Sequence, residues 1–414
     1  MKKTVYLFGA GASHSYNGSI NKVKPPLAKD FFKTFNKLKI SKDILVRVGA
    51  IISYVAKTRN LDENKFGSWN EDIEAFLTEL DDNILTDLDK IDGELTFNSL
   101  SNNKILTDIK AYDQMIFLFT SVLNEVQNGE VCSNYSKLVN LLNEGDTLIT
   151  FNWDTILDRA LYENGIWNIE DGYDIRFKAI FRDGWEKDTI RKKSKVKLLK
   201  LHGSTNWLMP YYSVNFETKK RGFSNINITE KDHPIYCFHY NTKAYETYDN
   251  RSFDDKKYTP FSYYYYPPNI PLKDYNNYSN IEQFSIGIFP DVSNYSKVKK
   301  ETNNNYSMPF IIPPVKYKDY GLMDGLLNSL WDSAEKSISE CDEMFIIGYS
   351  FPITDTKAWK LLKESFDKRG EYPKVTIVDP YPENIIKRIY EEFPRLTNVN
   401  VYPITFDMFI SDKI

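Results

Sequence analysis

The chain has 414 residues, enough for one large hydrophobic core or two modest ones, and its formal net charge is −4 at pH 7. This weak negative charge gives no general electrostatic reason for direct nucleic-acid binding, which we do not expect. The three cysteines, Cys132, Cys237 and Cys341, are far apart and odd in number, which indicates a reducing compartment. No stretch approaches the ~18 apolar residues of a membrane helix. Because the amino terminus also lacks a signal-peptide pattern, we expect a cytoplasmic protein.

The first predicted strand, residues 4–8, ends in a glycine turn, Gly9-Ala10-Gly11-Ala12-Ser13. Two glycines allow a tight turn and let the backbone approach a pyrophosphate at a helix amino terminus. The dinucleotide-binding fingerprint is incomplete, because His14 stands where a third glycine is usual. The pattern therefore fits an ordinary strand-to-helix turn about as well as a nucleotide site. We expect His14 to support the site or to lie at the surface.

After Pro25-Pro26, apolar residues recur at helical spacing as far as residue 143. We interpret residues 25–143 as a helical insertion after the first strand. From Thr147 strands and helices alternate, which is typical of a parallel sheet. The sequence therefore predicts an α/β fold with a doubly wound, Rossmann-like sheet. Its further strands are expected at 147–151, 196–201, 343–348, 374–379 and 399–403, and its helices near 156–161, 321–339, 354–368 and 382–392.

Residues 209–310 have no helical period and are rich in Tyr, Asn, Ser and Pro, including the run Tyr263-Tyr264-Tyr265-Tyr266. We interpret this segment as an irregular or β-rich insertion, because a structureless loop of this length is unusual in a compact domain. The chain would then be one catalytic domain, 1–414, with two insertions. Tyrosine is frequent at interfaces. The aromatic surface therefore indicates either packing of the insertion on its own domain or assembly of a homo-oligomer.

Polar residues follow two more predicted strands. Asn152 and Asp154 come after 147–151, and His202-Gly203-Ser204 comes after 196–201. Ligands of open α/β sheets bind outside the carboxyl ends of the strands, so we expect these residues and the glycine turn to form one site. The alternatives are an Asx turn or helix cap for Asn152 and Asp154, and a structural histidine for His202. A neutral imidazole can also accept a proton from water or a ribose hydroxyl.

Two later strand ends extend the pattern. Gly348 and Ser350 end the strand at 343–348, and Asp379 ends the strand at 374–379. An acidic residue in such a position can accept hydrogen bonds from both ribose hydroxyls. Asp379 precedes Pro380, however, so the alternative is that it only initiates a turn. Asp355 is a weaker candidate for the same role, and we expect it to cap the following helix.

The motif order G-A-G-A-S, T-F-N-W-D, L-H-G-S, G-Y-S-F-P and V-D-P frames nearly the whole chain. It resembles the sirtuin-like superfamily (silent information regulator type) of NAD-consuming enzymes, and more closely the bacterial sirtuin-like NAD hydrolases of antiphage defence. The resemblance implies that NAD is the substrate. It implies that Asn152 orders the nicotinamide ribose or the attacking water, that Asp154 contacts the nicotinamide carboxamide and that His202 is the general base. The remaining NAD-binding positions that it implies are Gly9, Ala10, Gly11, Ala12, Ser13, Gly203, Ser204, Gly348, Ser350 and Asp379.

The sequence departs from deacetylating sirtuins in three places. Those enzymes carry two Cys-x-x-Cys pairs for zinc after the His-Gly motif, and this chain has none. Cys237, His233 and His239 are too sparse to replace a four-ligand site, so we expect no metal. The G-I-P-D-F-R-like segment that normally follows the glycine turn is missing. Trp153 replaces a small aliphatic residue.

We therefore expect an NAD+ glycohydrolase that cleaves NAD to nicotinamide and ADP-ribose. The resemblance implies a regulated antiviral effector of abortive infection, which acts by NAD depletion. It also implies a partner such as a hexameric translocase-like ATPase, or self-assembly. The alternatives are an NAD-dependent protein deacylase, an ADP-ribosyltransferase, or a non-catalytic subunit that senses NAD or ADP-ribose.

Overall fold

The computed structural model describes residues 2–19, 21–38, 42–92, 104–127, 129–175, 179–182, 193–210, 212–215, 220–223, 236–239, 287–288, 306–313, 326–352 and 355–413. Most of the predicted insertion 209–310, with its tyrosine run, lies outside these residues. Within the described ranges, no helix has both the length and the apolar character needed to cross a membrane.

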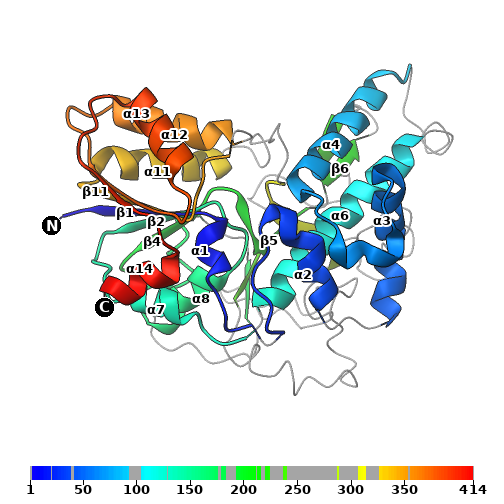
Figure 1. Ribbon diagram of the computed structural model, residues 1–414, viewed down its shortest axis with the longest axis horizontal. Coiled ribbons are helices and arrows are strands. Elements are labelled where there is room, and N and C mark those ends of the chain that lie inside the picture. Colours follow the sequence, from blue (N-terminus) through cyan, green and yellow to red (C-terminus); the bar gives the residue numbers. More distant parts are fainter. Residues whose placement is uncertain are drawn as a thin grey trace.

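A six-stranded sheet forms the centre of the molecule (Figure 1). Its order is β13-β12-β11-β1-β2-β4, and every neighbouring pair is parallel. Counted along the chain, this is the order 3-2-1-4-5-6 of a doubly wound fold, so the predicted fold class is confirmed. The strands are β1 (Thr4–Phe8), β2 (Thr147–Thr150), β4 (Lys197–Lys200), β11 (Glu343–Ile347), β12 (Lys374–Val378) and β13 (Val399–Tyr402).

Helices cover both faces of this sheet, because strands that are apolar on both sides need a cover on each. One face carries α1 (Ala10–His14), α7 (Ser133–Val139), α8 (Ile156–Glu163) and α14 (Phe406–Lys413) (Figure 1). The other carries α11 (Leu326–Glu340), α12 (Thr356–Asp367) and α13 (Glu383–Glu392). The periodicity of the sequence predicted most of these helices. It missed α14, and α7, which falls inside the predicted helical insertion, packs into the core of the sheet through Tyr135 and Leu138.

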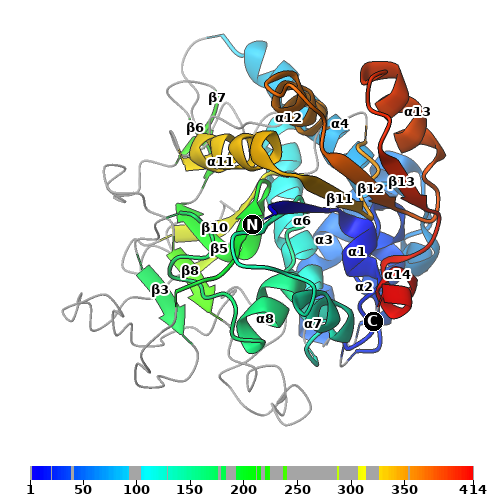
Figure 2. The same ribbon diagram turned by 90° about the vertical axis from the view of Figure 1, so that its left-hand side faces the viewer.

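The described helices after β1 form a separate helical block: α2 (Phe31–Lys37), α3 (Lys42–Arg59), α4 (Ile73–Asp89) and α6 (Lys104–Gln127), with the 3-10 turns η1 (Ala28–Asp30) and η2 (Glu63–Ser68). This block has its own hydrophobic core, built from residues between Val23 and Val126 together with Ile311. The two chain segments that connect it to the sheet lie side by side, because Glu130 N–H donates to the Gly18 carbonyl. The block stands on the side of the sheet to which the carboxyl ends of the strands point (Figures 1 and 2).

A second, smaller sheet continues from the first. Strand β5 (Gly203–Pro210) follows β4 after only Leu201 and His202, and it belongs to a sheet of order β3-β8-β5-β10-β9 (Figure 2). The other strands are β3 (Ala179–Arg182), β8 (Tyr236–His239), β9 (Gly287–Ile288) and β10 (Tyr306–Ile311), while β6 (Tyr212–Asn215) and β7 (Lys220–Phe223) pair separately. The described parts of the predicted insertion 209–310 are thus strands. His202 lies at the junction of the two sheets.

The turns after β1 and β11 pack backbone against backbone. Gly9 N–H donates to the Ile347 carbonyl at 3.1 Å, and Gly11 N–H donates to the Gly348 carbonyl at 2.9 Å. Gly348 has a φ of +59°, and a Cβ atom there would lie 2.3 Å from the Ala12 nitrogen. These turns belong to the two strands between which the order of a doubly wound sheet reverses. That reversal is where such sheets bind their ligands.

We expect Gly348→Ala to lower the free energy of unfolding by about 2 kcal/mol or more, because it combines a left-handed φ with a backbone clash. Gly370→Ala is the matched control, since a Cβ atom at position 370 would meet no atom within 4 Å. Urea unfolding followed by far-UV circular dichroism compares the two variants. Equal unfolding midpoints would contradict this account of the turns.

Candidate functional site

Asn152 connects the end of β2 to the glycine turn. Its side-chain Nδ2 donates to the Gly9 carbonyl at 2.8 Å and to Ser13 Oγ at 2.9 Å. Because the Gly9 carbonyl can only accept, the amide nitrogen must face it, which fixes the orientation of the amide group. The backbone N–H of Asn152 donates to Thr150 Oγ1. The side chain is therefore neither an Asx turn nor a helix cap, and it lies beside the glycine turn as predicted.

Asp154 is a buried carboxylate in the same turn. Its Oδ1 accepts the Ile156 N–H at 3.1 Å, so it forms the local Asx-type bond considered from the sequence. Burial raises the pKa of Asp154, while the Lys200 ammonium and the Ser13 hydroxyl act in the opposite direction. Ser13 thus lies between Asn152 and Asp154, and the first two predicted motifs meet at its hydroxyl.

The buried side chain of Lys200 binds the turn after β2. It is fully buried, its Nζ donates to the Asp154 carbonyl, and it forms an ion pair of 3.1 Å with Asp158 of α8. The Tyr173 hydroxyl donates to the other oxygen of Asp158 and accepts from Asn206 Nδ2. This buried polar network joins the predicted motif on β2 to the one on β4 and β5.

His202 lies among aromatic rings at the junction of the two sheets. Its ring centroid is 5.0 Å from that of Phe151, 6.0 Å from that of Trp153 and 6.4 Å from that of Trp331. Only 3% of His202 is exposed. Phe151 and Trp153, the chain neighbours of Asn152, contact His202, while the Asn152 side chain bonds to the glycine turn.

Trp153 links this site to the helical block. Its ring packs edge-on against Phe119 of α6 at 5.2 Å, and its Nε1 donates to the Ile312 carbonyl at 3.1 Å. The side-chain Oε1 of Gln127, at the end of α6, accepts the N–H of Thr155 in the same turn. The turn after β2 is thus held by the sheet, by β10 and its following residues, and by the helical block.

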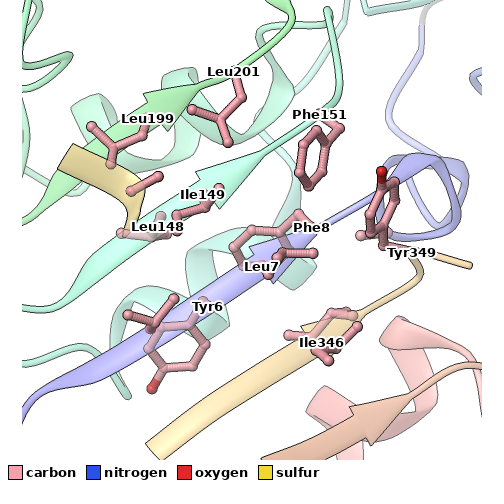
Figure 3. Close-up of a cluster of buried hydrophobic side chains, with 14 of the residues drawn as sticks. Tyr6, Leu7, Phe8, Leu148, Ile149, Phe151, Leu199, Leu201, Ile346 and Tyr349 are labelled. Carbon is pink, nitrogen blue, oxygen red and sulfur yellow. The ribbon is translucent and has the colours of Figure 1, made fainter. Parts of the chain in front are cut away.

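The carboxylate of Asp355, the residue before α12, also contacts His202. Asp355 Oδ2 lies 3.4 Å from His202 Nε2 and also accepts the Tyr349 hydroxyl at 2.5 Å. Figure 3 shows Tyr349 and Phe151 facing each other at the ends of their strands, and their rings stack at 4.4 Å. Asp355 occupies the N-cap position of α12, as expected, but its side chain makes no capping hydrogen bond.

The remaining predicted residues have other surroundings. Gly203, with a φ of +78°, packs against β10, where a Cβ atom would lie 2.1 Å from the Phe310 carbonyl oxygen. Ser204 is buried, and its hydroxyl lies 2.5 Å from Asn206 Oδ1. Ser350 is exposed beside the glycine turns, as is Ala10. His14 does not point into the turn, because its Nδ1 lies 2.8 Å from the Pro25 carbonyl oxygen.

Asp379 forms the turn that the alternative reading expected. Its Oδ1 accepts the Tyr381 N–H at 2.8 Å. The carboxylate is half-buried, and burial raises the pKa of Asp379 while the bond from Tyr381 lowers it. A carboxylate has further acceptor positions, so this turn leaves room for a second hydrogen-bond donor.

Sequence reasoning missed Lys200, Asp158 and Tyr349, and it gave Asp355 a different role. One signal was present: Lys200 is a charged residue in the otherwise apolar run Leu198-Leu199-Lys200-Leu201. A lysine on a central buried strand requires a partner, which is a reason to look for a buried acid. For Asp355 no such signal exists, because its partner His202 is distant in the sequence, and Tyr349 stacks on the equally distant Phe151.

No group of three or more His, Cys, Asp and Glu side chains could hold a metal ion in the part of the chain that the structure describes. His233 lies outside that part, and Cys237 and His239 are on β8. The expected absence of a structural zinc stays a prediction.

The sequence matches no protein-family model and no curated protein. The fold is similar to solved structures of Sir2 enzymes. A Sir2 complex with an inhibitor, 2′-O-acetyl-ADP-ribose and a deacetylated p53 peptide is 12% identical with a TM-score of 0.35, and the alignment covers 99% of this chain and 91% of that chain. A Sir2–p53 peptide–NAD+ structure is 13% identical with a TM-score of 0.35 and the same coverage. Similarity at this level says nothing about activity, so the functional argument rests on the site itself.

We expect Lys200→Met to lower the free energy of unfolding by about 3–5 kcal/mol, because Asp158 would remain as a buried carboxylate without its cation. Lys197→Met is the matched control. Lys197 pairs with Asp174 at 2.9 Å, but about half of its side chain is exposed, so its loss should cost about 1 kcal/mol or less. Chemical denaturation of both variants tests the difference. Similar losses would show that the ion pair of Lys200 does not hold the site together.

Proposed function

We propose that the protein is an NAD+ glycohydrolase, which cleaves NAD with water to nicotinamide and ADP-ribose. The observation that carries the proposal is the position of Asn152 and His202. They lie at the carboxyl ends of the neighbouring strands β2 and β4, and Asn152 is bonded to the glycine turn of β1. A polar amide and an imidazole thus stand beside the strand ends where doubly wound sheets bind dinucleotides.

The chemistry requires little from the protein. The bond between the ribose anomeric carbon and the nicotinamide nitrogen breaks, and its electron pair neutralises the pyridinium ring, so the leaving group needs no proton. The anomeric carbon passes through an oxocarbenium-like state and then bonds to the oxygen of a water molecule. His202 accepts the proton that this water releases.

The other residues would bind and orient the substrate. Asn152 donates both of its amide protons to Gly9 and Ser13, which leaves Oδ1 as the group that accepts from water or a ribose hydroxyl. The aromatic rings around His202 exclude bulk water from the reacting carbon. Asp379, on the other side of the glycine turns, is the candidate for the hydroxyls of the adenine-side ribose.

The glycine turn binds the pyrophosphate in this proposal, although its glycines have a second explanation. The N–H groups of Gly9, Gly11 and Ala12 all donate to backbone carbonyls of the protein. A Cβ atom at position 9 or 11 would also clash with the Gly348 backbone, so close packing alone requires glycine there. The position of the turn beside Asn152 supports the proposal, whereas its glycine pattern does not.

The two other enzyme classes remain alternatives. A deacylase or an ADP-ribosyltransferase would use the same NAD chemistry with a different acceptor in place of water. A sensor of NAD or ADP-ribose would not need an imidazole that is paired with a carboxylate, which disfavours that class. Release of nicotinamide and free ADP-ribose without an acyl-lysine peptide or protein acceptor would separate the hydrolase from both transferases.

We also propose that the activity is regulated. This part rests on the resemblance to antiphage NAD hydrolases and on the toxicity of uncontrolled NAD loss. Control would come from a homo-oligomer or from a partner such as a hexameric translocase-like ATPase. The contacts of Phe119 and Gln127 with the turn after β2 support a role for the helical block in this control.

We expect Asn152→Ala and His202→Ala each to lower NAD cleavage by about 100-fold or more, as is usual for loss of a positioning or proton-transfer group. Asn164→Ala is the matched control, because Asn164 Nδ2 also donates to a backbone carbonyl and a serine hydroxyl, but at the far end of α8. Nicotinamide release is measured by chromatography on proteins with normal melting curves. Full turnover by folded His202→Ala would refute the base assignment.

For Asp379→Asn we expect a higher KM with little change in kcat, because ribose binding is shared by the ground state and the transition state. Asparagine keeps an oxygen that can accept the Tyr381 N–H, so the turn should survive. Steady-state kinetics with NAD test this. A fall in kcat at unchanged KM would argue against a ribose contact.

A further inference from the structure

Asp355 is a buried carboxylate in contact with His202 and Tyr349. It is 2% exposed, its Oδ2 lies 3.4 Å from His202 Nε2, and the same oxygen accepts the Tyr349 hydroxyl. A buried carboxylate is costly unless it is paired and hydrogen-bonded. Oδ2 makes both contacts, so the imidazole and the phenol meet at one carboxylate oxygen.

We infer that Asp355 is the positioning residue of His202, and that Tyr349 holds Asp355 in place. The inference rests on the proposed function only in taking His202 as the base. A carboxylate beside Nε2 favours the tautomer that carries its proton on Nε2, and the lone pair then lies on Nδ1. Asp355 thereby selects the ring nitrogen that accepts the proton of water, and it stabilises the imidazolium that forms.

Aromatic rings also contact the imidazole. The rings of Phe151, Trp153 and Trp331 limit its rotation, whereas a carboxylate can also favour one tautomer. A cation also lies on one of these rings, because Lys357 Nζ is 4.5 Å from the Trp331 centroid. Burial lowers the pKa of Lys357.

The turn after β11 explains how Tyr349 and Asp355 reach His202. Gly348 and Phe351 both have a positive φ, which is unusual for phenylalanine. Arg388 of α13 donates to the Phe351 carbonyl at 3.2 Å and so holds the turn. Tyr349 is fixed by its stack on Phe151 and by its bond to Asp355. A backbone that is strained next to a candidate site is consistent with a functional constraint.

The decisive variant is Asp355→Asn. An asparagine amide can donate to Nε2 and so favours the tautomer that carries its proton on Nδ1. In that tautomer Nδ1 cannot accept the proton of water. We expect kcat to fall by about 100-fold while KM changes by less than about twofold. Tyr349→Phe keeps the stacked ring and should cause a smaller fall, and Asp355→Glu should recover part of the activity. Asp332→Asn, an exposed acid-to-amide change on α11, should leave both constants unchanged.

A spectroscopic measurement tests the same point without NAD. The chain has four histidines, so 15N-histidine labelling gives few side-chain signals, and His202→Gln identifies those of His202. We expect the Nε2–H tautomer in the wild type and a shift toward Nδ1–H in Asp355→Asn. The same tautomer in both proteins would overturn the inference, even if kcat fell. A wild type that does not cleave NAD would refute the proposed function instead, while the tautomer comparison would still decide the role of Asp355.

Discussion

The backbone contact between the turns after β1 and β11 is the constraint on which the site depends. No side chain fits between Gly9, Gly11 and Gly348, so the two central strands of the sheet end in turns that touch directly. This contact draws Tyr349 onto Phe151, and it presents the Gly9 carbonyl to Asn152. The glycine turn is therefore held on one side by Gly348 and on the other by Asn152. A ligand that binds here meets a backbone that is already ordered, which reduces the entropic cost of binding.

The second constraint is the buried ammonium of Lys200. The chain leaves the parallel sheet at Lys200 and enters the smaller sheet at Gly203, so His202 lies on a connection of two residues between two sheets. Such a connection could rotate, but Lys200 is anchored to Asp158 and to the Asp154 carbonyl. Gly203 is fixed by β10 on the other side. The bonds of Lys200 and the packing of Gly203 thus fix the chain on both sides of His202.

The sequence predicted the sheet, most of its helices and the convergence of the strand ends, because these depend on local periodicity and on the general topology of α/β proteins. It placed Asn152 beside the glycine turn for the same reason. It could not separate a phosphate-binding turn from a turn packed on Gly348, since both require glycine at positions 9 and 11. It missed the contact of Asp355 with His202, because an aspartate before a helix looks like a cap when its distant partner is unknown. The role of Lys200 depends likewise on Asp158, which lies far from it in the chain.

The aromatic enclosure of His202 makes the carboxylate of Asp355 more effective than it would be at the surface. Phe151 directly follows β2, Trp331 is on α11, and Trp153 is in a turn that also contacts the helical block. These rings replace water around the imidazole and lower the local dielectric constant, so a charge at 3.4 Å interacts more strongly. The same rings leave His202 only 3% exposed, which limits the water that reaches the base. Proton transfer and exclusion of solvent therefore depend on one set of contacts, and Trp153 joins that set to the helical block.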